Sequence, residues 1–344
     1  MTIKKNIILA IETSCDETAA SVYQDGVGIR SNVLFSQIDL HKNYGGVVPE
    51  IASRSHLEKI IPITRQALEA AEVSLDDVDV CAVTNGPGLP GSLLVGVCFT
   101  KAVVACLGKP IIGVNHLEAH VFSSCINQQV PFPHLCLSVS GGHTALYIVN
   151  AIGNYTVIGQ TLDDAAGEAL DKVAKLLQLP YPGGPIIEKL ASAVNFQDFF
   201  SYPRSKLTTP DFSFSGLKTA VLYDLVKRGA YELTTQRLLP TATTAFKAQV
   251  ASSLLVCLGD IFKDKLTLVY KNYPHIKAVT FVGGVACNQY LRNELNAWCT
   301  QRELLFIAPE RKLCSDNAAM IAFVANYRAQ QNLFDDLNLD LKIL

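Results

Sequence analysis

The chain has 344 residues, enough for two hydrophobic cores, and 49% hydrophobic with 17% charged residues is a globular composition. A formal net charge of −2 excludes a global basic field, so any RNA would bind a local patch or a surface completed by partners. No segment reaches the roughly 18 uninterrupted apolar residues of a membrane span, because Lys101 interrupts the most apolar stretch. We expect a soluble, cytoplasmic protein with no membrane partner, whose ten scattered cysteines are reduced and mostly buried.

The first half of the chain predicts a hairpin followed by a strand, a glycine loop and a helix. Asp16 and Glu17 lie in the polar turn of that hairpin. If the turn opens onto a ligand, either carboxylate is a candidate proton acceptor, and the alternative is a solvated turn. In chain order, the strand, turn, strand, strand and glycine loop are predicted at 7–12, 13–18, 19–23, 78–83 and 84–91.

A histidine pair follows the first half's glycine loop. His116 and His120 are four residues apart, so on a helix they share one face and suit two ligands of one metal. The alternative is a solvated helix that carries two ordinary histidines. Glu118 lies in the middle of the motif and not directly after the first histidine, which removes the mechanical basis of a zinc protease.

The second half of the chain repeats the plan of the first, which indicates a duplicated α/β fold with a ligand expected where the turns of the halves converge. Both glycine turns, 140–144 and 283–288, let backbone N–H groups approach an anion. Neither matches the Walker pattern, and no dinucleotide fingerprint follows the first strand. The strands of this half are predicted at 135–139, 145–149 and 278–282, with an insertion at about 161–244.

The final helix is predicted to begin at Asp316, which is placed to cap it. Two histidines leave room for a carboxylate ligand, and Asp316 is the candidate. Two histidines and one aspartate that leave coordination positions of the metal open suit iron or zinc.

Eight sequence blocks, spread from about Ile7 to Ala325, together resemble the tRNA N6-adenosine threonylcarbamoyltransferase family, bacterial branch, once mislabelled as an O-sialoglycoprotein endopeptidase. The eight blocks occur in order, which makes the resemblance specific. They are IETSCDET (11–18), HLEAH (116–120), SGGHT (140–144), DDAAGEALDK (163–172), YPGGP (181–185), DFSFSGLK (211–218), VGGVACN (282–288) and SDN (315–317).

The resemblance implies a duplicated, actin-like, two-lobed nucleotide-binding fold of the sugar-kinase and actin type. We expect the first lobe at 1–133 plus 318–344 and the second at 134–317. The implied reaction moves threonylcarbamoyl from threonylcarbamoyl-AMP to N6 of the adenosine 3′ of the anticodon, in tRNAs that read codons beginning with A. The implied partners are tRNA, an inactive paralogue of the same fold and a small ATPase.

The resemblance also assigns site residues. His116, His120 and Asp316 match the ligands of one divalent transition metal per chain, with Fe²⁺ expected and Zn²⁺ the alternative. The histidine motif here carries Leu and Ala where many relatives have Met and Gly, and this keeps the small and apolar classes. The positions that match substrate-binding residues are Ser138, Val139, Ser140, Gly141, Gly142, Asp171, Gly184 and Asn288.

Two other functions remain open from the residues. One is a small-molecule kinase or ATPase of the same fold, although such enzymes hold magnesium with carboxylates and have no use for the histidine pair. The other is a non-catalytic scaffold, which would have no need of the metal set. Candidate cations for a tRNA surface are Arg204, Lys206, Arg237, Arg311 and Lys312.

Overall fold

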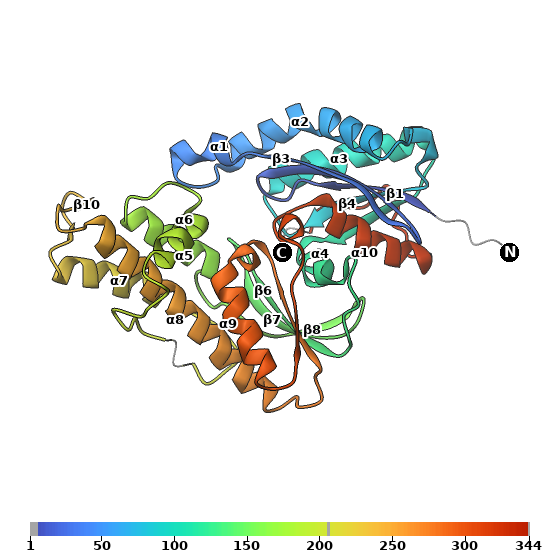
Figure 1. The fold of residues 1–344 in the computed structure, drawn as a ribbon. Coiled ribbons are helices and arrows are strands. Elements are labelled where there is room, and N and C mark those ends of the chain that lie inside the picture. Colours follow the sequence, from blue (N-terminus) through green and yellow to red (C-terminus); the bar gives the residue numbers. More distant parts are fainter. Residues whose placement is uncertain (1–5, 205–206, 343–344) are drawn as a thin grey trace. The chain divides into compact units, whose positions relative to one another are not determined.

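Two five-stranded mixed sheets with matching strand order carry the fold (Figure 1). The first has the order β3-β2-β1-β4-β5, and the second has the order β8-β7-β6-β11-β12. Each sheet joins an antiparallel three-strand meander to two parallel strands. This repetition confirms the duplicated α/β fold. The strands are β1 Ile7–Glu12, β2 Glu17–Gln24, β3 Gly28–Ser36, β4 Val80–Gly86, β5 Ile111–Asn115, β6 His134–Val139, β7 Thr144–Ala151, β8 Asn154–Gln160, β11 Ala278–Val282 and β12 Leu305–Ile307.

The chain divides into two compact units, Met1–Gln129 with Ser315–Leu344, and Val130–Cys314. The computed structural model describes residues 6–204 and 207–342. The unit boundaries fall at 129/130 and 314/315, a few residues before those expected from the sequence. Asp316 therefore lies in the first unit, which also contains both histidines of the predicted metal site.

In the first unit, helices cover both faces of the sheet (Figure 1). Two long helices, α2 and α3, pack together and against β2, β3 and β4, and α10 packs on the other face against β1 and β2. Apolar side chains of β1, β2 and β4 are fully buried between these layers. The helices of this unit are α1 Ile38–His41, α2 Pro49–Ala70, α3 Pro90–Leu107, α4 His116–Phe122 and α10 Ala318–Gln330.

In the second unit, a large core surrounds α8, whose aromatic and aliphatic side chains meet those of the sheet and of the inserted segment. The insertion predicted at about 161–244 contains three helices and a small hairpin. The helices are α5 Ala166–Leu176, α6 Gly183–Ser192, α7 Ser215–Lys227, α8 Thr244–Tyr270 and α9 Gln289–Thr300, and the hairpin strands are β9 Tyr231–Glu232 and β10 Arg237–Leu238.

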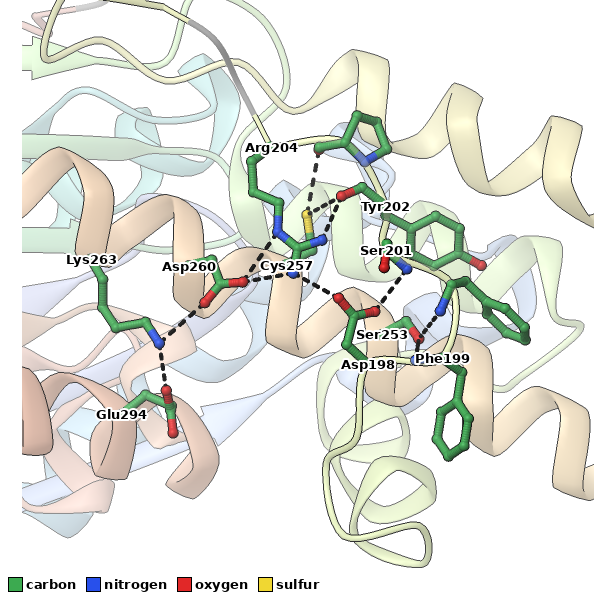
Figure 2. Close-up of polar contacts among 12 residues, drawn as sticks. Asp198, Phe199, Ser201, Tyr202, Arg204, Ser253, Cys257, Asp260, Lys263 and Glu294 are labelled. Atoms are coloured by element: carbon green, nitrogen blue, oxygen red, sulfur yellow. Dashed lines mark hydrogen bonds and ion pairs between the residues drawn. The ribbon is translucent and has the colours of Figure 1, made fainter.

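A charged network fixes the irregular part of the insertion to α8 (Figure 2). The guanidinium of Arg204 bonds Asp198 at 2.8 Å and Asp260 at 2.6 Å. Lys263 continues the network from Asp260, at 3.2 Å, to Glu294 of α9, at 2.6 Å. Arg204 therefore has a structural role, and its charge is already matched by carboxylates.

Two local expectations were wrong. The predicted polar turn 13–18 ends earlier, because Glu17 and Thr18 begin β2 and pair with Ser36 and Phe35 of β3. Asp316 does not cap the last helix, because the side chain of Asn317 accepts the N–H of Met320 there, at 3.1 Å.

Two helices, α3 and α8, are long and apolar enough to span a membrane by length and composition alone. In α8, 67% of the apolar window is buried inside the protein, and α3 packs on α2 and the first sheet. In α3 the buried share is 33%, so of the two only α8 is buried in the way of a core helix.

Candidate functional site

The histidine pair sits at the start of a short buried helix directly after a core strand. The side chain of Asn115, the last residue of β5, caps α4 by accepting the N–H of Glu118 at 3.0 Å, so the helix begins at His116. His120 follows one turn later, and the two ring centroids are 4.6 Å apart. Both rings are buried, with 8% and 1% of their surface exposed. The expectation that they share a helix face is confirmed, and the solvated-helix alternative is wrong.

Asp316 joins the two histidines from the segment that precedes α10. Its Oδ1 lies 2.9 Å from Nε2 of His120 and 3.5 Å from Nε2 of His116. One ligand atom from each of the three residues falls within 4.8 Å of the others. Two imidazoles and a carboxylate that converge in this way form a three-ligand set with open positions, which fits a single transition metal.

A buried carboxylate, Glu12, contacts His116 at the ring nitrogen that does not face Asp316. One Glu12 oxygen lies 3.2 Å from Nδ1 of His116 and accepts the Thr84 hydroxyl, while the other accepts the Ser14 N–H at 2.5 Å. Nε2 of His116 therefore faces Asp316, while Nδ1 is held by Glu12 and by the Ser14 hydroxyl, which lies 3.1 Å away. Sequence reasoning missed this role and treated Glu12 only as a strand end. The need for a partner follows from the burial of this carboxylate, which only the folded structure reveals.

The electrostatics of the set fit a cation. Burial alone would lower the pKa of His116, but the charges of Asp316 and Glu12 raise this pKa well above its ordinary value. Burial would raise the pKa of Asp316, but His116 and His120 hold this pKa well below the usual range. Without metal, the His116 imidazolium is therefore held between the carboxylates of Glu12 and Asp316. A bound divalent cation can supply positive charge at the same place.

The acidic turn is buried, which contradicts the solvated alternative for Asp16. Only 8% of Asp16 is exposed, and His56 braces the turn by contacting the Cys15 carbonyl at 3.0 Å and the Thr18 hydroxyl at 2.8 Å. Burial, followed by the charges of Asp316 and Asp16, raises the pKa of Glu17 well above its ordinary value. In the metal-free protein Glu17 therefore favours its neutral form, which leaves Asp16 as the candidate for a proton acceptor.

The second unit contains a separate pocket of about 380 Å³. Residues at the N-terminal ends of helices α5, α6 and α9 line it. Of the predicted substrate-binding residues, Gly141, Asp171, Gly184 and Asn288 line the pocket, whereas Ser138, Val139, Ser140 and Gly142 are not among its lining residues. The lining residues are Gly141, Gly167, Leu170, Asp171, Pro182, Gly184, Pro185, Glu188, Gly284, Val285, Cys287, Asn288 and Arg311.

Two glycines of the pocket region are required by close backbone contacts. A Cβ on Gly283, whose φ is +89°, would lie 2.4 Å from the Val139 carbonyl oxygen, so the strand β6 and the second glycine turn touch only because no side chain intervenes. A Cβ on Gly167 would lie 2.5 Å from the Ser140 carbonyl oxygen. The second glycine turn, 283–288, therefore packs against the end of β6, next to the first glycine turn, 140–144.

Acidic side chains already occupy two of the helix ends. Asp171 accepts the Gly183 N–H at 2.7 Å, and Glu188 accepts those of Gln289 and Tyr290 at 2.6 and 3.2 Å. Asn288 caps α9 through the Leu291 N–H at 2.9 Å. Glu188 was missed by sequence reasoning, because a single glutamate on an amphipathic helix carries no distinguishing signal.

The comparisons with known proteins agree along the whole chain. The model of the tRNA N6-adenosine threonylcarbamoyltransferase family matches residues 28–323. The enzyme of that name from Geotalea uraniireducens is 48% identical over 97% of this chain and 94% of its own length. The one from Protochlamydia amoebophila is 47% identical over 97% of this chain and 96% of its own length.

This chain belongs to the tRNA N6-adenosine threonylcarbamoyltransferase family. The family predicted from the sequence is confirmed, and the kinase and scaffold alternatives are not favoured. The family name is that of an acyltransferase that modifies tRNA.

Solved structures show the actin-like fold. Component A of the Acidaminococcus fermentans (R)-2-hydroxyglutaryl-CoA dehydratase superposes with a TM-score of 0.55 over 94% of this chain and 99% of its own, at 15% identity. Full-length HypF superposes with a TM-score of 0.62 over 97% of this chain and 48% of its own length, at 14% identity. At these identities the likeness establishes the fold and nothing finer.

The candidate tRNA cations differ in their surroundings. Lys312 pairs with Glu310 at 2.9 Å on the surface, Arg311 bonds Gln289 at 2.8 Å beside the pocket, and Arg237 is exposed on β10. Arg204 is held by its carboxylates, and Lys206 lies outside the described residues.

Proposed function

We propose that this chain transfers threonylcarbamoyl from threonylcarbamoyl-AMP to N6 of the adenosine 3′ of the anticodon in tRNAs that read codons beginning with A. The observation that carries the proposal is near end-to-end similarity to enzymes with this name, 48% and 47% identical in two cases, in a chain that keeps the histidine–aspartate triad. A scaffold would gain nothing from three converging ligands.

The metal in this proposal is one Fe²⁺, with Zn²⁺ as the alternative, held by His116, His120 and Asp316. When bound, it would act as a Lewis acid toward an oxygen of the donor. Glu12 orients His116 for that task, and the burial of both imidazoles keeps competing water from the ligands.

The pocket of the second unit is the proposed site for the adenylate part of the donor. Gly141, Asp171, Gly184 and Asn288 line it, and the adjacent turn residues Ser138, Val139, Ser140 and Gly142 are proposed to approach the phosphate through their backbone. Because AMP is a good leaving group, the reaction needs no covalent intermediate, and positioning supplies much of the rate.

Proton handling falls to Asp16 in this proposal. As the adenosine amine bonds to the carbamoyl carbon and the bond to AMP breaks, the amine must lose a proton. Asp16 is the candidate acceptor, and the neutral Glu17 beside it is proposed to act as a hydrogen-bond donor. The proposed partners are tRNA, an inactive paralogue of the same fold and a small ATPase, in the cytoplasm.

The test is reconstitution. The chain is incubated with its proposed partners, threonylcarbamoyl-AMP synthase, ATP, threonine, bicarbonate and unmodified tRNA, and digested tRNA is examined for threonylcarbamoyladenosine. Modified nucleoside should appear with the wild-type chain and be absent with His120→Ala. If both reactions give equal amounts, or the wild-type chain gives none where the G. uraniireducens relative succeeds, the proposal is wrong.

A further inference from the structure

Two cysteine thiols meet beside the pocket of the second unit. Cys287 ends the 3-10 helix Gly284–Cys287 and lines the pocket, and Cys314 directly follows the 3-10 helix Arg311–Leu313. Their sulfurs lie near the carbonyl oxygens of consecutive residues: Sγ of Cys314 is 3.5 Å from the oxygen of Glu310, and Sγ of Cys287 is 3.6 Å from the oxygen of Arg311. The two thiols also share a hydrogen bond.

The surroundings favour a thiolate at Cys287. The hydrogen bond from Cys314, opposed by burial and helped by the charges of Arg292 and Arg311, lowers the pKa of Cys287 to about 7. Arg292 is itself fixed, since its Nη2 donates to Cys314 Sγ at 3.1 Å and to the Pro309 carbonyl at 2.7 Å. A partly exposed thiolate with a second thiol beside it is the arrangement of cysteines that react with peroxide.

The other buried thiols whose pKa is shifted are in the opposite environment, and they include Cys314, whose pKa is raised by its hydrogen bond with Cys287 and by burial. All ten cysteines are free, and burial raises the pKa of Cys81 and of Cys299 to about 12. Cys98 and Cys106 are exposed, and they provide internal comparisons for reactivity. The paired geometry is what distinguishes Cys287 from these residues.

We propose that Cys287 and Cys314 form a disulfide when the protein meets hydrogen peroxide, and that this cross-link weakens nucleotide binding in the adjacent pocket. The second half of this inference rests on the proposed function of the pocket as an adenylate site.

The chemistry balances without a further cofactor. The Cys287 thiolate attacks one peroxide oxygen, the O–O bond breaks, and the departing hydroxide takes a proton to become water. Cys314 then attacks the sulfur of the resulting sulfenic acid, the S–O bond breaks, and the hydroxide leaves as water with the Cys314 proton. Two thiols and one peroxide give one disulfide and two waters, and an added dithiol reverses the change.

The cross-link acts on the pocket through its wall. It joins the turn that carries Gly284, Val285 and Cys287 to the segment that carries Arg311, and all four residues line the pocket. It also removes the thiol protons, so neither sulfur can donate to the neighbouring carbonyls of Glu310 and Arg311. The pocket wall formed by these residues then differs from its shape in the reduced protein. An adenine nucleotide should therefore bind about tenfold more weakly.

The test maps the disulfide and measures AMP binding separately. Reduced full-length protein is treated with a small excess of hydrogen peroxide, remaining thiols are alkylated, and linked peptides are identified by mass spectrometry. The Cys287–Cys314 link should appear in the wild type and in Cys98→Ala, and be absent in Cys287→Ala. Calorimetry should show weaker AMP binding after oxidation, recovery with dithiothreitol, and no effect of peroxide on the affinity of Cys287→Ala.

Each contrary outcome has a definite meaning. If Cys287 and Cys314 remain alkylatable at a peroxide dose that oxidises Cys98, the thiol pair is not redox-active and the inference is wrong. A mapped disulfide with unchanged AMP affinity overturns the effect on binding. If reduced protein binds no AMP, the proposed adenylate site and the binding half of the inference both fail, whereas the mapped peptides still decide the thiol chemistry.

Discussion

At the scale of single residues, Glu12 decides how His116 is presented. Its carboxylate is wholly buried and contacts Nδ1 of His116, which leaves Nε2 directed at Asp316. Among the described residues, Nδ1 of His120 has no such partner, so the two imidazoles are held differently. A buried carboxylate behind a histidine fixes the ring and increases its basicity toward metal.

We therefore expect Glu12→Gln to lower metal affinity by about 10- to 100-fold while both histidines remain in place. Competition with a chromogenic chelator measures this directly, and the visible spectrum of the Co²⁺-loaded protein should shift because the His116 ligand changes. The matched control is Glu50→Gln, which alters an exposed glutamate on α2. Equal affinities and spectra for the two variants would show that Glu12 only fills space.

The neighbouring Glu17 should affect stability with a defined pH dependence. Its pKa is raised in the folded protein by burial and nearby carboxylates, while the unfolded value stays near 4.5. The stabilising contribution of the neutral form is complete below about 4.5 and is lost as pH rises towards the folded pKa.

Glu17→Gln, which cannot ionise, should therefore raise Tm more at pH 8 than at pH 5. Thermal melts of metal-free protein at both pH values test this. A uniform shift at the two values would mean that Glu17 is not held neutral by the fold.

At the scale of elements, an ion pair joins the two helices nearest the metal ligands. Oε2 of Glu118 on α4 lies 2.7 Å from Nη2 of Arg328 on α10. Arg328 also donates to the Gly113 carbonyl. Only 8% of the Glu118 side chain is exposed, so loss of Arg328 leaves a largely buried charge without its partner.

Arg328→Gln should lower the free energy of unfolding by about 2 kcal/mol, between the values for exposed and fully buried pairs. Urea denaturation measures this, with the exposed i,i+4 pair of α2 as the control. There, Arg54→Gln should cost no more than about 0.5 kcal/mol. Similar losses for the two variants would show that the α4–α10 pair behaves as a surface contact.

Sequence reasoning predicted most of the buried apolar strands and missed the part-exposed outer ones, but it also missed β5, although this strand is apolar and buried. The buried runs that became β1, β6 and β11 were identified because they are short, apolar and bounded by glycines or polar turns. The outer strands β3 and β8 were missed, since each has only one buried residue in an otherwise part-exposed sequence. Their existence depends on pairing with β2 and β7, which no local pattern reveals.

For the site, spacing predicted the histidine pair, but contacts distant in the chain supplied the rest. Glu12 and His116 are separated by 104 residues, and His120 and Asp316 by 196. No local pattern identifies such partners. Asp316 was chosen as the carboxylate at the start of the last helix and was supported by the resemblance to a family, while Glu12 required the folded structure.

At the scale of the whole molecule, the two binding features belong to different units. The three metal ligands lie in the first unit, and every residue that lines the pocket lies in the second. Each unit has its own core, so a change inside one site should leave the other able to bind its ligand. The transfer reaction, by contrast, should need both.

Gly184→Leu and His120→Ala should separate the two functions. A Cβ on Gly184 meets only Leu170, at 3.9 Å, so a leucine there fills the pocket without a backbone clash and should abolish AMP binding while metal content stays at the wild-type level. His120→Ala should do the reverse, and both should lose transfer. Gly216→Leu is the control, because its Cβ meets open space on α7 outside the pocket. Metal analysis and AMP calorimetry on all three test the separation, and loss of both ligands in either site variant, with an unchanged Tm, would show that the sites are coupled.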